Sequence, residues 1–257
     1  MSEGALQGSG VTGLRRHSIF NDLCLLEFMV FFGLDGALAV GAAFQVVEQE
    51  AALFPEVEPI TDFEAEASLQ RGSSRLGTGL SPDLDHTAWL LQSGGGYTWA
   101  AWGTPRLGVR VDQASGDRDP NDGQNQRFDT LFGARRFEFG PTGLYGAIAR
   151  ANLRSPEIRA SAKPLKTIET SLAHRWIWLE SPFDAFTAAG VRDASGRSGS
   201  YVGQQLEGRI RWDIIPGNCR LDTGVTTLFK GSFLESAPNA NPNGDTLYAW
   251  VEWTFTF

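Results

Sequence analysis

The final twelve positions of the chain, TLYAWVEWTFTF (246–257), alternate between two kinds of residue. A period of two is typical of a β-strand that separates two different environments. One side of such a strand would be wholly apolar: Leu247, Ala249, Val251, Trp253, Phe255 and Phe257. The pattern therefore predicts a strand with one aromatic-rich face in a position where soluble domains usually fray.

The same alternation recurs in segments of about ten residues, separated by stretches rich in Gly, Pro, Asp or Asn. It predicts strands near residues 61–71, 86–99, 104–115, 143–151, 156–163, 166–180, 201–214, 218–230 and 245–257. Three connections are short turns: GTP (103–105), KPLK (163–166) and PGN (216–218). Three others are long loops: 115–142, 181–200 and 231–244. Short turns at one end of the strands and long loops at the other are typical of outer-membrane β-barrels.

Individual strands divide cleanly into an apolar and a charged face. In RLGVRVD (106–112) and in QLEGRIRWDI (205–214), aliphatic and aromatic residues alternate with Arg, Asp, Glu and Gln. A β-sandwich would also alternate, but here the polar faces are dense in charge of both signs. The apolar faces carry aromatics near strand ends, as in the girdles of membrane barrels: Trp99, Trp176, Trp178, Trp212, Phe229 and Trp253. We expect an all-β fold, an antiparallel transmembrane β-barrel of the outer-membrane type with about ten or eleven strands.

The N-terminal part is less regular. Residues 1–16 contain no apolar segment of the kind found in secretory signals, and we expect residues 1–18 to be a disordered or divergent start. The apolar stretch 23–47 is long enough for a membrane helix, but Glu27, Asp35 and the turn signal GLDG interrupt it. We interpret it as a hairpin of strands near 19–33 and 37–48 with a turn at Leu34–Gly36. Residues 1–257 would then form a single barrel domain.

Composition and charge restrict the function. A hydrophobic fraction of 42% suits a membrane barrel, whose strands need only every second residue to be apolar. The formal net charge of −8 argues against a nucleic-acid partner. The three histidines, His17, His86 and His174, lie in no nucleophile or zinc motif, so we expect no enzyme activity.

Three ordered features resemble the alginate export family of outer-membrane porins. They are ASGDRDPNDG followed by FDTLF within residues 95–132, RDASGRSGSYVGQQLE within 183–212, and the closing strand that ends in Phe. The resemblance covers residues 86–257, whereas residues 1–85 match poorly, and the strands are fewer than in the barrels of the family. It implies a monomeric antiparallel barrel in the bacterial outer membrane that passes an anionic polysaccharide through an arginine-rich lumen. It also implies that the barrel-insertion machinery reads the terminal aromatic strand.

A polyanion path needs cationic side chains that bind weakly at many places. Arginine suits this role because guanidinium stays charged and pairs bidentately with carboxylates. The strand faces assigned above give the lumen candidates: Arg106, Arg110, Arg159, Lys163, Arg175, Arg209, Arg211 and Arg220. Alternatively, these charges pair with neighbouring carboxylates for structural reasons, and the protein is a structural or adhesive outer-membrane barrel with its function in its loops and no transport role.

The loop DRDPNDG (117–123) carries oxygen ligands at close spacing. A calcium ion requires several such oxygens on a tight loop, and the candidates are Asp117, Asp119, Asn121 and Asp122. The spacing departs from the EF-hand loop, since the glycine falls one place late and no Glu follows at the twelfth position. A solvated turn rich in Asp and Asn explains the loop equally well, and no other cofactor is expected.

Overall fold

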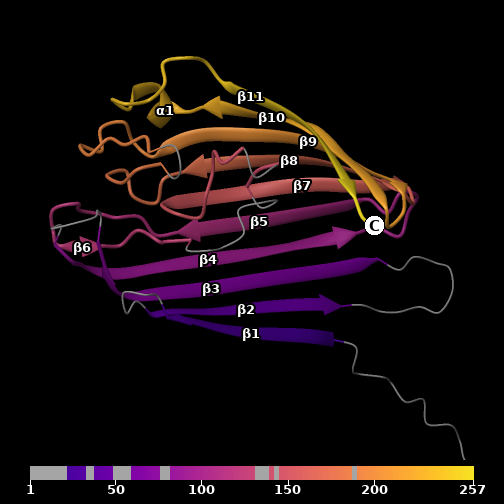
Figure 1. Ribbon diagram of the computed structural model, residues 1–257, viewed down its shortest axis with the longest axis horizontal. Helices are drawn as coiled ribbons and strands as arrows, with labels where there is room; N and C mark the ends of the chain where they lie inside the picture. Colours follow the sequence, from indigo (N-terminus) through magenta and orange to yellow (C-terminus); the bar gives the residue numbers. More distant parts are fainter. Residues whose placement is uncertain are drawn as a thin grey trace, which may run out of the picture.

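The computed structural model describes residues 22–32, 38–48, 59–75, 82–130, 139–141, 145–186 and 190–257. The elements are β1 (Asp22–Phe32), β2 (Leu38–Glu48), β3 (Ile60–Ser74), β4 (Leu84–Thr98), β5 (Arg106–Ala114), β6 (Gln124–Asn125), β7 (Leu153–Leu165), β8 (Ile168–Trp178), β9 (Tyr201–Ile215), β10 (Cys219–Lys230), α1 (Ser232–Ser236) and β11 (Thr246–Phe255) (Figure 1). The expectations for residues 1–18 and for the turn at 34–36 fall outside the described residues. Across the described ranges, no helix is both long and apolar enough to cross a membrane.

The strands form one sheet in the order β1-β2-β3-β4-β5-β7-β8-β9-β10-β11, and β6 pairs with β4 in parallel. Every neighbouring pair along that path is antiparallel. The all-β antiparallel class is therefore confirmed. The hairpin in the N-terminal part is confirmed as well, because β1 pairs with β2 from Asp22↔Glu48 to Phe32↔Leu38. The alternative of a membrane helix over residues 23–47 is wrong.

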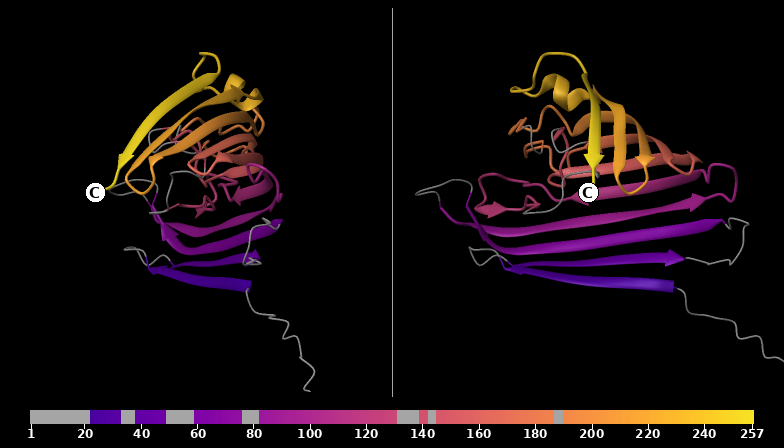
Figure 2. Two further views of the ribbon diagram at one scale, coloured as in Figure 1. Left: turned by 90° about the vertical axis from the view of Figure 1, so that its right-hand side faces the viewer. Right: turned by 45° about the vertical axis from the view of Figure 1, so that its right-hand side comes forward.

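The sheet is curved but open, and this corrects the expectation of a closed barrel (Figure 2). β1 and β11 are its two edges, and within the described chain they do not pair with each other. Closure requires a strand tilt and stagger that bring the first and last strands into register. Alternation within each strand specifies which face a residue occupies, but it carries no information about the pairing of two edges far apart in sequence.

The distribution of polarity across the sheet is the reverse of that in a soluble domain. On β5, Val109 is 58% exposed on the convex side, whereas Asp112 on the concave side is fully buried. The same holds along the sheet, where the convex side carries exposed large apolar residues: Phe63, Leu69, Leu91, Leu107, Ile158, Leu172, Leu206, Ile210, Val225 and Val251. Contiguous apolar surface of this kind marks a face that contacts lipid or another apolar partner.

One predicted strand is absent. Residues 145–152, expected within a strand near 143–151, are irregular and lie between β5 and β7. Asn152 adopts a left-handed backbone conformation with φ of 47°, and its amide donates to the carbonyl of Ser115 at 3.1 Å. Its side-chain amide also donates to the carbonyl of Ser181 at 3.0 Å. The alternation of this segment reflects packing of a loop against the sheet, where Ile148 is buried, and not strand pairing.

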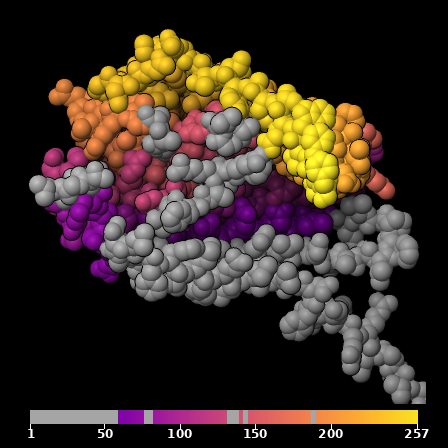
Figure 3. Space-filling view, viewed as in Figure 1, coloured from indigo at the N-terminus to yellow at the C-terminus, as the bar shows by residue number. Residues whose placement is uncertain are grey.

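An apolar cluster fills the concave side at the end of the strands that carries the long loops. Its buried members are Phe139, Ile148, Leu153, Ile177, Leu179, Phe186, Val191, Val202, Leu228, Phe233, Leu234 and Ala237. They come from the loops before β7 and β9, from the ends of β7 to β10, and from α1. Figure 3 looks onto this side, which is hollowed, with residues of β3 and β4 (purple) at its floor.

Candidate functional site

The concave side of the sheet carries a set of paired charges that we call the charged inner face. Its arginines are Arg106, Arg110, Arg150, Arg159, Arg175, Arg209, Arg211 and Arg220, and its carboxylates are Asp62, Glu64, Glu66, Asp112, Glu157, Glu169, Glu207, Asp213 and Asp222. Strand alternation brings all of them except Arg150 to one side, because side chains two residues apart on a strand point the same way. The antiparallel register then sets opposite charges next to each other, as in Glu157↔Arg175 and Asp222↔Arg211.

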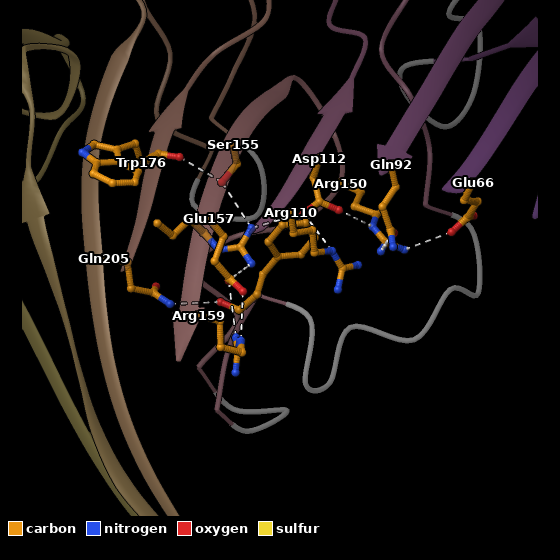
Figure 4. A network of polar contacts seen from close by, with 12 residues as sticks. Glu66, Gln92, Arg110, Asp112, Arg150, Ser155, Glu157, Arg159, Trp176 and Gln205 are labelled. Atoms are coloured by element: carbon orange, nitrogen blue, oxygen red, sulfur yellow. Dashed lines mark hydrogen bonds and ion pairs between the residues drawn. The ribbon is translucent and has the colours of Figure 1, made fainter. Parts of the chain in front are cut away.

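The centre of the charged inner face is a buried cluster around Arg175, whose partners Asp112, Ser155 and Glu157 are labelled in Figure 4. Nη1 of Arg175 donates to Oδ2 of Asp112 at 3.3 Å and to Oγ of Ser155 at 3.2 Å. Nη2 donates to Glu157. The guanidinium also lies 4.6 Å from the centre of the Phe139 ring. Its side chain is only 2% exposed, so the two carboxylates compensate a cation that has lost its water.

Arg150 completes this cluster from outside the strands (Figure 4). It lies in the irregular segment before β7, and its guanidinium forms ion pairs with Asp112 at 3.4 Å and with Glu66 at 3.9 Å. It also donates to the side chain of Gln92. Sequence reasoning missed this residue because it assigned 143–151 to a strand. Only knowledge that the loop folds onto the sheet could have identified it.

The other predicted arginines pair in the same way towards the short-turn end of the sheet. Arg110 lies 3.2 Å from Asp112, and Arg159 lies 2.9 Å from Glu157 and 3.8 Å from Glu207. The remaining pairs are Arg106 with Asp62, Arg209 with Asp222, Arg211 with Asp222 and Glu169, and Arg220 with Asp213. The face is therefore a lattice of alternating charge and not a uniformly basic surface.

The arginine side chains become more exposed from the centre of this lattice towards the short-turn end of the sheet. The Arg175 side chain is 2% exposed, that of Arg106 is 32% exposed and that of Arg220 is 49% exposed. Lys163, the eighth predicted cation, lies outside the lattice near the turn that follows β7, where it is exposed and its amide donates to the carbonyl of Gly103 at 2.6 Å. The charged inner face is therefore open to water at the short-turn end and covered by the apolar cluster at the long-loop end.

Tyr145 is a second residue, after Arg150, that reaches the concave side of the sheet from an irregular segment and that the sequence did not reveal. Its hydroxyl donates to Oε1 of Gln205 at 2.8 Å, which joins the loop before β7 to the concave side of β9. Burial of the phenol raises its pKa to about 12. This hydroxyl therefore stays protonated and acts as a fixed hydrogen-bond donor.

The proposed calcium ligands do not converge on one point. Oδ1 of Asp119 accepts from the amide of Asn121 at 3.0 Å, and Oδ1 of Asp122 accepts from the amide of Gln124 at 2.8 Å. These are the local hydrogen bonds of Asx turns. Asp117 is buried elsewhere, and burial, followed by repulsion from Asp184, raises its pKa. The part of the chain that the structure describes contains no group of three or more His, Cys, Asp or Glu residues arranged to hold a metal.

The two histidines among the described residues, His86 and His174, each contact a glutamine side chain of a neighbouring strand. Nε2 of His86 lies 3.2 Å from Oε1 of Gln70, and Nε2 of His174 lies 2.9 Å from Oε1 of Gln204. The His174 ring also packs on Trp176, with the ring centres 4.2 Å apart. Each ring is thus held by an amide neighbour on an adjacent strand.

The family model for alginate export matches residues 56–246. The match begins before residue 86, so the segment 56–85 belongs to the matched region, contrary to the expectation that residues 1–85 match poorly. The last eleven residues lie beyond it. Among curated proteins, none matches the chain.

Proposed function

The chain belongs to the alginate export family, and we propose that it is a porin that passes an anionic polysaccharide across the bacterial outer membrane. The family consists of outer-membrane transport porins and not of enzymes. The observation that carries the proposal is the reversed polarity of the sheet, with Val109 exposed on one side and Asp112 buried on the other. A sheet of this kind suits lipid on its convex side and water or a polar solute on its concave side.

The charged inner face supports a path for a polymer that carries carboxylates. Each arginine already contacts carboxylates of the protein, so a uronate group of the polymer would exchange with an equivalent group. Such exchange keeps the attraction at each place weak, which a permeating chain needs in order to leave as well as enter. The more exposed cations, Arg106 and Arg220, are the ones a polymer would meet at the short-turn end.

The open edges require partners in a membrane. In lipid, unpaired backbone groups cost several kcal/mol each, so spanning sheets close into barrels. We therefore propose that β1 and β11 are paired in the inserted protein, within one barrel domain. The terminal strand fits recognition by the barrel-insertion machinery, because Val251, Trp253 and Phe255 form an exposed apolar row along it.

The alternative is a structural or adhesive barrel without transport. The apolar cluster favours it, because this cluster fills the concave side at the long-loop end. A path for a polymer would have to pass beside the cluster or displace the loops that contribute Phe139 and Phe186.

Reconstitution of the full chain into lipid vesicles distinguishes the two functions. We expect release of an entrapped uronate oligosaccharide to be faster than release of a neutral oligosaccharide of equal length. Planar-bilayer recordings of the same protein should show conductance with a preference for anions. Folded, inserted protein without conductance or release would support the structural barrel instead.

A further inference from the structure

A pocket at the long-loop end has features that the charged inner face lacks. Its volume is about 460 Å³, and its walls are Arg118, Asp119, Pro120 and Asn121 from the loop after β5, with Phe183, Arg192 and Ala194 from the loop after β8. It therefore lies between two loops that are far apart in sequence, outside the strands.

The two arginines of the pocket differ from those of the charged inner face. Within the described chain, neither Arg118 nor Arg192 forms an ion pair, whereas each arginine of the inner face contacts a carboxylate of the protein. Nε of Arg192 donates to the carbonyl of Phe183 at 2.9 Å, which orients the guanidinium and leaves its terminal nitrogens for another partner. Arg118 is exposed. The pocket thus presents two cations that form no ion pair among the described residues, and the charge of Arg192 acts on the neighbouring buried carboxyl of Asp117 only to oppose the rise in its pKa that burial causes.

Hydrogen bonds between the loops hold these walls in place. Oδ2 of Asp184 accepts from the amide of Asp117 at 3.1 Å, and its Oδ1 accepts from Arg127 at 2.9 Å. On the other side, the amide of Arg192 donates to Oδ1 of Asn239, from the loop after α1. A site held in this way loses little conformational entropy when a ligand binds.

The remaining walls identify the chemistry of the ligand. Phe183 is 38% exposed, and its ring packs on Gly196, where an added Cβ would lie 2.7 Å from the ring. An exposed ring provides an apolar face for the C–H side of a sugar. Asp119 and Asn121 provide oxygens that accept from hydroxyl groups. Asp119 would also repel a dianion such as phosphate, so a singly charged carboxylate on a sugar ring fits best.

We propose that this pocket binds a uronate residue of a polysaccharide, with Arg118 and Arg192 on its carboxylate and Phe183 against its ring. The inference rests on the proposed function, because it places a binding site for the same polymer at the long-loop mouth. Long loops are extracellular in outer-membrane barrels. The pocket is then the last place where the protein holds the polymer before release.

The test is calorimetric titration of the detergent-solubilised full chain with a uronate tetrasaccharide and, separately, with a neutral glucose tetrasaccharide. We expect the uronate to bind more tightly, and Arg118→Gln or Arg192→Gln to weaken its affinity on the order of tenfold. Phe183→Leu should also weaken it. Arg197→Gln is the matched control, since Arg197 is exposed on the same loop as Arg192 but does not line the pocket.

Two outcomes would overturn the inference: equal affinity for both sugars, or equal affinity of the Arg118→Gln and Arg197→Gln variants for the uronate. Vesicle release measured on the same proteins separates this inference from the proposed function. Uronate release by a wild-type protein whose affinity does not depend on Arg118 would overturn the pocket alone. Binding that depends on Arg118, in a protein that releases nothing, would support the pocket and overturn transport.

Discussion

The two faces of β5 differ in what surrounds them, although their residues alternate along nine consecutive positions. The convex face presents Leu107, Val109 and Val111, all more than 40% exposed. The concave face presents Arg110, which lies 3.2 Å from the buried Asp112. A soluble sheet would bury the first row and hydrate the second. The comparison shows that the apolar row needs an apolar environment outside the sheet, whereas the charged row is stabilised by its own partners.

The largest expected effect is loss of the charge at the centre of the concave face. Arg175→Met leaves Asp112 and Glu157 buried without their shared cation, and we expect a cost of about 3–5 kcal/mol in the free energy of unfolding. Urea titration of vesicle-inserted protein measures it. Arg175→Lys keeps a positive charge beside both carboxylates and should lose less stability than Arg175→Met. Equal losses for the two variants would mean that Arg175 does not act through its charge.

A charge on the convex face should be slightly less costly. Val109→Arg would place a guanidinium towards the bilayer, and we expect a loss of about 2–4 kcal/mol for a position near the midplane. The same urea titration in vesicles measures the loss, with Val109→Leu as the control of similar size and polarity to the native row. If Val109→Arg were as stable as Val109→Leu, the convex face would not be in lipid.

The periphery of the charged inner face should tolerate change. Arg220→Met removes an ion pair in which the side chains are 49% and 31% exposed, and water compensates the remaining Asp213. We expect a change of about 0–1 kcal/mol, from the same titration used for Arg175→Met. A loss as large as that of the central variant would show that the short-turn end is not open to water.

The smallest effect on stability is expected from Asp193, a carboxylate whose hydrogen-bond donors are neutral. The hydroxyls of Ser195 and Ser198, assisted by backbone amides, hold the pKa of Asp193 well below its usual range. Because the pKa is lower in the folded state, this interaction contributes stability above the ordinary aspartate pKa of about 4, and that stability is lost as the pH falls towards the folded value. We expect Asp193→Asn to flatten the dependence of the melting temperature on pH between about pH 5 and 3. An unchanged dependence would exclude Asp193 as a contributor.

The alternation of polarity predicted the long strands and the division of their faces, but it also predicted a strand near 143–151 that the structure lacks. It placed Arg110, Arg175 and Arg209 on the concave side, where the structure has them. It did not predict the ion pairs between neighbouring strands in detail, because register depends on turns and bulges such as the shift between Cys219 and Arg220.

The sequence was less informative wherever a segment is fixed by distant contacts. Arg150 and Tyr145 reach the charged inner face from an irregular segment whose alternation mimicked that of a strand. The pocket between Arg118 and Arg192 depends on Asp184 and Asn239, which hold loops from different parts of the chain together. Local periodicity cannot reveal such contacts, since the two that hold the pocket join residues 67 and 47 positions apart.

The order of the sheet has a consequence for the sidedness of the chain in a membrane. Because each strand runs opposite to its neighbour along the path from β1 to β11, the start of β1 at Asp22 and the end of β11 at Phe255 lie at the same end of the sheet (Figure 1). That end also carries the short turns, which face the periplasm in outer-membrane barrels. An epitope placed directly before β1 or after β11 would therefore be shielded from protease added to intact cells, whereas one in the loop around Asn121 would be cleaved.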